Sequence, residues 1–160
     1  MIKQLKTIDD FNKYAADIWL CVNYMWKSLD VKPEDIDPET IYKDISEGFL
    51  KPTECLLVDV TEVGKGINGF MYSKINKTNV IKRTCHVWYS YIKNNISKTV
   101  FDELIFETEQ FGINNGCKKF SMTSFRNPKA WAKKMKHLKY IPTKYLMIFE
   151  KILEDYHEVV

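Results

Sequence analysis

The chain has 160 residues, of which 45% are hydrophobic and 28% charged, and a formal net charge of +3 at pH 7. This length suits one domain with a sizeable core, and the hydrophobic fraction excludes an intrinsically disordered chain. Apolar runs stay well short of the roughly 20 residues that span a bilayer, and the first six residues form no apolar leader. We therefore expect a single domain over residues 1–160, located in the cytoplasm, with no membrane partner.

Hydrophobic periodicity in the first half predicts a strand, two helices and a hairpin. Asp9 or Asp10 opens the first helix, which ends near Leu29. Asp37, followed by a proline, caps the second helix, which stops at Gly48. In chain order, the expected elements are a strand over 2–7, helices over 9–29 and 37–48, and paired strands over 56–60 and 69–73 with a turn over 64–66.

The second half predicts a further strand, a helix, a strand, a basic helix and a last strand. Residues 84–91 are rich in aromatic and β-branched side chains, which favour strands. Ser97 caps the next helix, which Gly116 follows, and Asn127 opens the basic helix. The expected elements are a strand over 84–91, a helix over 97–111, a strand over 120–125, a helix over 127–138 and a strand over 145–149. This order predicts an α/β fold with a mixed, mostly antiparallel sheet and helices on both faces.

Basic residues are distributed unevenly along the chain. No acidic residue occurs between Glu109 and Glu150, and nine lysines and arginines lie in that window. Such a patch favours a polyanion, while a solvated lysine face that serves solubility is the alternative. The candidate polyanion-binding residues are Arg126, Lys129, Lys133, Lys134 and Lys136.

The four cysteines and three histidines show no metal-binding spacing. The cysteines are about 30 residues apart and form no C-x-x-C pair, and the histidines form no H-E-x-x-H motif. Three of the cysteines lie in apolar segments, where cysteine usually packs as a small hydrophobic residue. We therefore expect buried thiols and no metal.

The order of elements and several residues of the second half resemble the GNAT superfamily of N-acetyltransferases. Its members carry a long helix after the third strand of a meander, then a small-residue stop, an asparagine that opens a further helix, and an aromatic residue before the last strand. Here these features are Ser97 to Phe111, Asn115-Gly116-Cys117, Asn127-Pro128 and Lys139-Tyr140. The likeness looks closest to small acetyltransferase-like proteins of bacteriophages, in which features matching Gly116-Cys117, Arg126, Trp131 and Lys139-Tyr140 recur.

The resemblance implies acetyl-CoA as the cofactor and an amine as the acceptor. It implies that backbone groups of Tyr91, Ile92 and Lys93 hold the pantetheine arm. The implied contacts to the rest of the cofactor come from Ser97, Lys98, Thr99 and Asn127. Members of the family bind the pyrophosphate with a Q/R-x-x-G-x-G/A loop, whereas residues 93–100 contain no glycine. Side chains at the two glycine positions would crowd a pyrophosphate.

His86 is the candidate catalytic base. It is the one ordinary titratable base on the predicted strand over 84–91, and its pKa range suits proton transfer near neutral pH. The alternative is a hydrogen-bonded structural histidine. Tyr89 and Tyr91 are expected to pack in the sheet rather than to act as acids.

Two functional interpretations follow. The first is an acetyl-CoA-dependent N-acyltransferase with a degenerate pyrophosphate loop. The second is a catalytically silent GNAT-like fold that serves as a phage structural or virion-associated protein. In this second interpretation, the basic segment 118–144 binds DNA or another virion protein, and the protein lies in the host cytoplasm or is packaged in the virion.

Overall fold

The computed structural model describes residues 1–29, 32, 34, 36–64, 66–76, 83–94, 96–123 and 128–140. These residues belong to two compact units, 1–126 and 127–160. The expectation of a single domain stays a prediction. Three predicted features lie outside the described residues: Arg126, Asn127 and the strand over 145–149.

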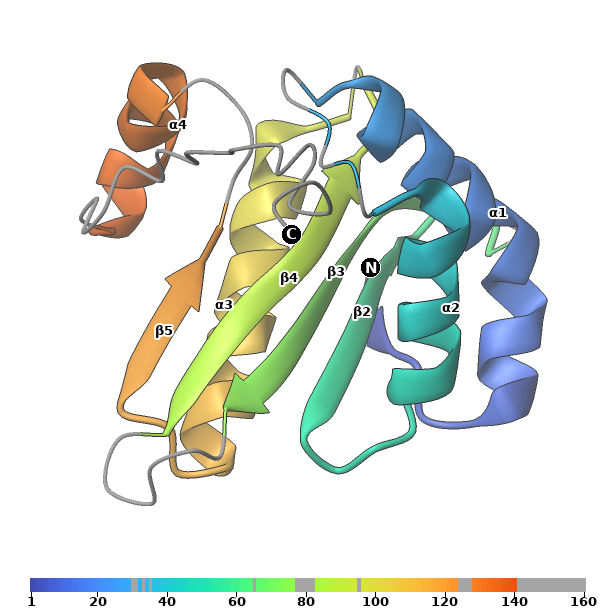
Figure 1. Ribbon diagram of the computed structural model, residues 1–160, viewed down its shortest axis with the longest axis horizontal. Helices are drawn as coiled ribbons and strands as arrows, with labels where there is room; N and C mark the ends of the chain where they lie inside the picture. Colours follow the sequence, from blue (N-terminus) through green and yellow to red (C-terminus); the bar gives the residue numbers. More distant parts are fainter. Residues whose placement is uncertain are drawn as a thin grey trace, which may run out of the picture. The chain divides into compact units, whose positions relative to one another are not determined.

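The first unit contains a five-stranded sheet with helices on both faces (Figure 1). Its elements are β1 (Ile2–Gln4), α1 (Ile8–Lys27), α2 (Pro38–Gly48), β2 (Glu54–Val60), β3 (Ile67–Asn76), β4 (Thr84–Ile92), α3 (Lys98–Asn114) and β5 (Lys119–Met122). The strands follow the order β1-β2-β3-β4-β5. Neighbours from β1 to β4 are antiparallel, and β4 and β5 are parallel. The predicted α/β fold with a mixed, mostly antiparallel sheet is confirmed.

The first two helices begin where side chains satisfy their free amides. The N-cap of α1 is Thr7, whose Oγ1 accepts a hydrogen bond from the Asp10 amide at 3.0 Å. The prediction that Asp9 or Asp10 opens this helix is wrong by two or three residues, because both lie inside the first turn, where their negative charges interact favourably with the helix dipole. Asp37 caps α2 as predicted, accepting from the Thr40 amide at 2.7 Å.

Several strand boundaries differ from the prediction. β1 ends at Gln4 rather than at residue 7, and β2 begins two residues earlier, at Glu54. β5 ends at Met122, so the predicted strand over 120–125 is longer than the strand that forms. Every residue of β2 is buried, because helices cover both of its faces.

Two layers of helix enclose the sheet. α1 and α2 pack on one face, where their apolar side chains form a buried core with those of β2 and β3, among them Ile18, Val22, Ile45, Leu56, Val58 and Phe70. α3 covers the opposite face, where Thr108 Oγ1 lies 3.3 Å from the sulfur of Met71. Figure 1 shows α2 in front of the sheet and α3 behind it.

The cysteines pack as predicted. Cys21, Cys55 and Cys85 are buried and unbridged, and Cys117 is partly exposed. Burial raises the pKa of Cys21 and Cys85 to about 11 and that of Cys55 to about 12. These side chains therefore remain thiols at neutral pH.

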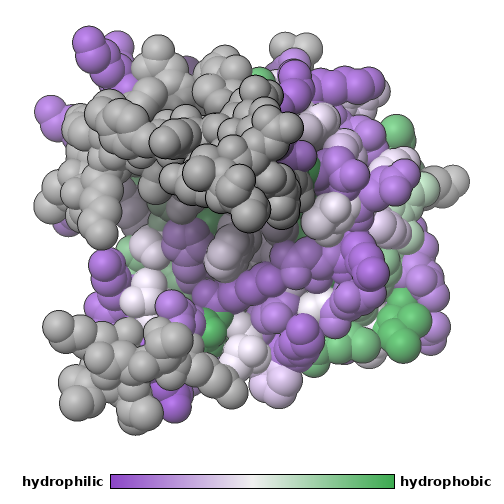
Figure 2. All heavy atoms as spheres, viewed as in Figure 1, coloured by the Kyte–Doolittle hydropathy of each residue, from purple (hydrophilic) through white to green (hydrophobic). Residues whose placement is uncertain are grey.

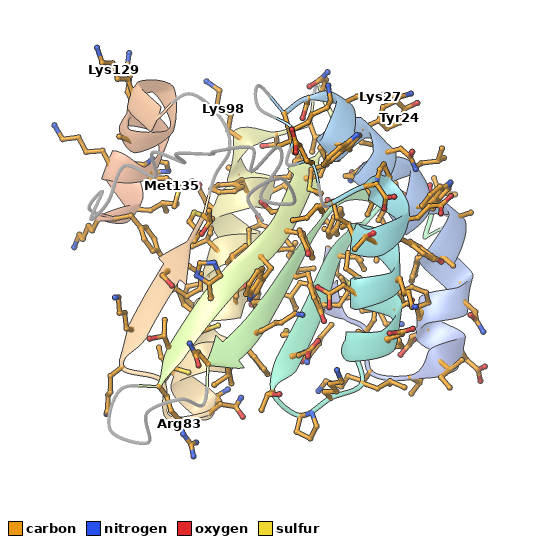
Figure 3. All side chains as sticks on the ribbon, viewed as in Figure 1. Tyr24, Lys27, Arg83, Lys98, Lys129 and Met135 are labelled. Carbon is orange, nitrogen blue, oxygen red and sulfur yellow. The ribbon has the colours of Figure 1, made fainter. Side chains whose placement is uncertain are left out.

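The second unit begins with a short helix, α4 (Pro128–Met135), followed by a 3₁₀ turn over Lys136–Leu138. The helix predicted over 127–138 is therefore α-helical only as far as Met135, and its last turn is a 3₁₀ turn. Lys139, with a left-handed φ of 62°, ends that turn. Among the basic residues, Lys129, Lys133 and Lys136 are exposed (Lys129 is labelled in Figure 3), and the Lys134 side chain lies outside the described part.

Candidate functional site

Strands β4 and β5 pair over only four residues and then separate. Thr84 to Val87 pair with Lys119 to Met122, but β4 continues to Ile92. In the described part of the chain, no strand pairs with residues 88–92 along that edge (Figure 1). The edge can therefore offer backbone N–H and C=O groups to another extended molecule.

A β-bulge marks the beginning of this open edge. Tyr72 of β3 pairs with Tyr89, and the next residue, Ser73, pairs with Val87, so Trp88 is the extra residue of β4. Bulges interrupt the ladder and re-aim side chains. The Trp88 side chain is 52% exposed, and its ring centroid lies 6.5 Å from that of Tyr89.

The backbone beyond the bulge alternates between the two edges of β4. The Lys93 amide donates to the carbonyl oxygen of Asn68, in β3, at 2.8 Å. Because successive strand residues direct their backbone groups to opposite edges, Ser90 and Ile92 direct theirs toward the open edge. Among the three residues predicted to hold pantetheine, Ile92 thus has the suitable backbone orientation, while Tyr91 and Lys93 face β3.

Helix α3 begins six residues after the open edge ends. Ser97 is its N-cap, as predicted, with Oγ 3.3 Å from the Thr99 amide and 2.7 Å from Thr99 Oγ1. Ser97, Lys98 and Thr99 are all exposed (Lys98 is labelled in Figure 3). The first turn contains no acidic residue that would offset the positive end of the helix dipole. These three predicted phosphate-binding residues therefore form one polar, anion-compatible helix end.

His86 lies where β4 and β5 begin to separate. Its Nδ1 is 2.7 Å from Ser121 Oγ, and its Nε2 is 3.2 Å from Thr123 Oγ1. Burial lowers the pKa of His86 below its ordinary value of 6.5, so the imidazole is neutral at neutral pH. One ring nitrogen then donates and the other accepts. This arrangement fits a proton acceptor, and it also fits a structural link between the two strands.

Sequence reasoning missed a polar cluster on the same face of the sheet. The two carboxylate oxygens of Asp44 accept from Lys74 Nζ at 2.7 and 2.9 Å. The Lys74 ammonium also lies 5.4 Å from the ring centroid of Tyr72 and 5.5 Å from that of Trp88. Burial and the nearby Asp44 raise the pKa of Tyr89 to about 12, so its hydroxyl stays protonated. Figure 2 shows hydrophilic residues across the middle of this face.

The opposite face holds a cavity of about 350 Å³, beside the C-terminal half of α3. It lies away from the open edge of β4, and its lining includes Gln4, Cys55, Glu107 and Phe111. Among the described residues, no three His, Cys, Asp or Glu side chains are grouped as metal ligands. Within the same residues, no helix is long and apolar enough to cross a membrane.

No family model and no curated protein matches this chain. Its structure is nevertheless similar to solved structures of acetyltransferases. The aminoglycoside N-acetyltransferase AAC(6')-Iy in complex with CoA matches with a TM-score of 0.68 and 14% identity, over 95% of this chain and 94% of that one. The aminoglycoside 6'-N-acetyltransferase AAC(6')-Ih from Acinetobacter baumannii matches with a TM-score of 0.70 and 9% identity, over 96% of this chain and 100% of that one.

A third similar structure is glucosamine-6-phosphate N-acetyltransferase from Arabidopsis thaliana, with a TM-score of 0.66 and 10% identity, over 95% of this chain and 99% of that one. Such low identities establish the fold rather than the activity. They show that the chain has a GNAT-like fold.

Proposed function

We propose that this protein is an acetyl-CoA-dependent N-acetyltransferase with a glycine-free pyrophosphate loop. The separation of β4 from β5 after Val87, with the bulge at Trp88, is the observation that carries the proposal. Pantetheine is an extended chain with two amide groups, and such a chain can pair with a free strand edge as an added strand does. Ser90 and Ile92 direct their backbone groups toward that edge.

The pyrophosphate would lie at the beginning of α3. Helix N-termini attract anions through their free amides and the helix dipole. Here the Ser97 and Thr99 hydroxyls and the Lys98 ammonium add side-chain donors beside a loop that lacks the glycines of the family's motif. We expect binding through these exposed groups to weaken as salt concentration rises. Asn127 remains a candidate outside the described residues.

His86 is the proposed proton acceptor. Acetyl-CoA would supply the acetyl group, whose C–S bond breaks as the amine nitrogen forms the new amide bond, and CoA would leave as a thiolate that takes up a proton to become the free thiol. The attacking amine loses a proton, and the neutral imidazole held by Ser121 and Thr123 can accept it. His86 lies two residues before the bulge, in the stretch of β4 that still pairs with β5.

Isothermal titration calorimetry with acetyl-CoA tests this function. We expect saturable binding in the titration. In a separate unfolding measurement, acetyl-CoA at a hundred times its Kd should raise the free energy of unfolding by about 2.7 kcal/mol. The double variant Lys98→Ala/Thr99→Ala should bind more weakly. Lys43→Ala, which removes an exposed lysine of α2, is the matched control and should bind as the wild type does. An absence of binding at millimolar acetyl-CoA would overturn the proposal.

The phage structural interpretation receives no support from the comparisons, and neither DNA nor a virion protein is proposed as a partner. The polyanion-binding role of Arg126, Lys129, Lys133, Lys134 and Lys136 stays a prediction.

A further inference from the structure

The acceptor of the proposed reaction must approach β4 from one side. On the side of α3, Cys85 and Val87 are buried, and Cys85 Sγ lies 3.9 Å from the carbonyl oxygen of Thr108 in that helix. On the side of α1 and α2, Trp88 exposes half of its surface at the bulge. An amine that reaches an acetyl group beside the bulge therefore meets Trp88 on its way.

Aromatic side chains follow β4 along this approach. The Trp88 ring is in edge-to-face contact with His86, with ring centroids 5.3 Å apart. Farther along the strand, Tyr91 stacks with Tyr24 of α1, at 6.3 Å and an interplanar angle of 22°. Tyr24 is itself 49% exposed (Figure 3). Half-exposed tryptophan and tyrosine rings provide apolar area at low entropic cost, which suits contact with a flat apolar group.

Among the described residues, two carboxylates near these rings are already paired with lysines. Asp44 holds the Lys74 ammonium with both oxygens, and Lys74 in turn lies over the Trp88 ring. On α1, Asp17 lies 3.9 Å from Lys93 Nζ, just beyond the end of β4. A polycation gains affinity from unpaired carboxylates, and these two pairs offer it no net negative charge.

We propose that the acceptor is an aromatic monoamine whose ring packs against Trp88, rather than a polycation such as an aminoglycoside or a linear polyamine. The inference rests on the proposed acetyltransferase function and names the substrate class of that site. Packing on Trp88 places the amine next to His86, because the two side chains are in contact.

Acetylation assays that measure released CoA thiol test this substrate class. The probes are 2-phenylethylamine, hexylamine, spermidine and kanamycin, each at low and high salt. We expect kcat/KM for 2-phenylethylamine to exceed that of each other amine at least tenfold, and to change little with salt. Recognition of a polycation would instead weaken steeply as salt rises.

Two variants assign the preference to Trp88. Trp88→Ala should lower kcat/KM for 2-phenylethylamine about tenfold, mainly through KM, and leave the Kd for acetyl-CoA unchanged. Phe106→Ala is the matched control, because Phe106 is a similarly exposed aromatic residue on the outside of α3. It should change neither value.

The outcomes separate this proposal from the function on which it rests. If acetyl-CoA binds and spermidine or kanamycin is the better acceptor, or if Trp88→Ala acetylates 2-phenylethylamine as the wild type does, the aromatic acceptor is excluded and the acetyltransferase function stands. If acetyl-CoA does not bind in the calorimeter, both proposals fail.

Discussion

The two halves of β4 share a neighbour on one edge and differ on the other. Thr84 to Val87 lie between β3 and β5, and their side chains alternate between buried and partly exposed. In the described part of the chain, Tyr89 to Ile92 pair with β3 alone and Trp88 is the unpaired bulge residue, and none of these five side chains is fully buried. The first half is part of the scaffold, while the second half has the exposed backbone and side chains that a binding site needs. One strand thus serves both purposes, and the bulge is the boundary.

The largest expected effect concerns the scaffold. Leu104 of α3 is fully buried on the sheet face opposite α1 and α2, and Leu104→Ala should lower the free energy of unfolding by about 2–5 kcal/mol. Phe106→Ala, on the exposed side of the same helix, should change it by less than about 0.5 kcal/mol. Urea unfolding measures both. Equal losses in the two variants would contradict the assignment of α3 to the core.

A smaller effect should distinguish the open half of β4. A Cβ on Gly69 would lie 2.5 Å from the Tyr91 carbonyl oxygen and 3.0 Å from the Ile92 Cα. Gly69→Ala should therefore push β4 away from β3, cost about 1–3 kcal/mol of unfolding free energy and weaken acetyl-CoA binding.

The matched control for this change is Gly66→Ala. The atoms nearest to a Cβ there belong to the Asp17 carboxylate, from 3.3 Å outward, and this is the end of a side chain rather than backbone. If Gly69→Ala left both stability and acetyl-CoA affinity unchanged, the close pairing of β3 with the open half of β4 would be wrong.

The smallest expected effect is a pH dependence of the free energy of unfolding, which arises from His86. Because burial lowers the pKa of His86 below 6.5 in the folded protein, the unfolded chain binds this proton more readily. The contribution of His86 to stability is therefore fully present above pH 6.5 and decreases as the pH falls through 6.5 toward the lower folded-state value.

Unfolding free energies measured between pH 5 and about 8 check this sign. His86→Gln, which cannot take up the proton, should lose less stability on acidification than the wild type. A steeper loss in His86→Gln than in the wild type would show that the direction is wrong.

Local signals were sufficient to predict most elements. Asp37 and Ser97 cap their helices through bonds to amides three and two residues away, so short sequence motifs identify both. At the beginning of α1 the same logic was ambiguous, because Thr7, Asp9 and Asp10 are all capable caps and only the backbone conformation of Thr7 decides between them.

The site depends on contacts that no local motif encodes. Residues 84–91 predict one uniform strand, and the bulge at Trp88 appears only when β4 is aligned with β3. The Asp44–Lys74 pair joins a helix to a strand 30 residues later. Single-sequence patterns carry no information about such pairings, so they could identify the strand and the helix end but not the cluster on the sheet face.

The most direct test of the central claim is amide hydrogen exchange, followed by NMR, with and without saturating acetyl-CoA. If the open edge of β4 binds the pantetheine arm, exchange at Ser90 and Ile92 should slow markedly. The amides of Thr84 to Val87, already enclosed between β3 and β5, should exchange at the same rate in both states. Unchanged exchange at Ser90 and Ile92 in the presence of bound acetyl-CoA would contradict the account.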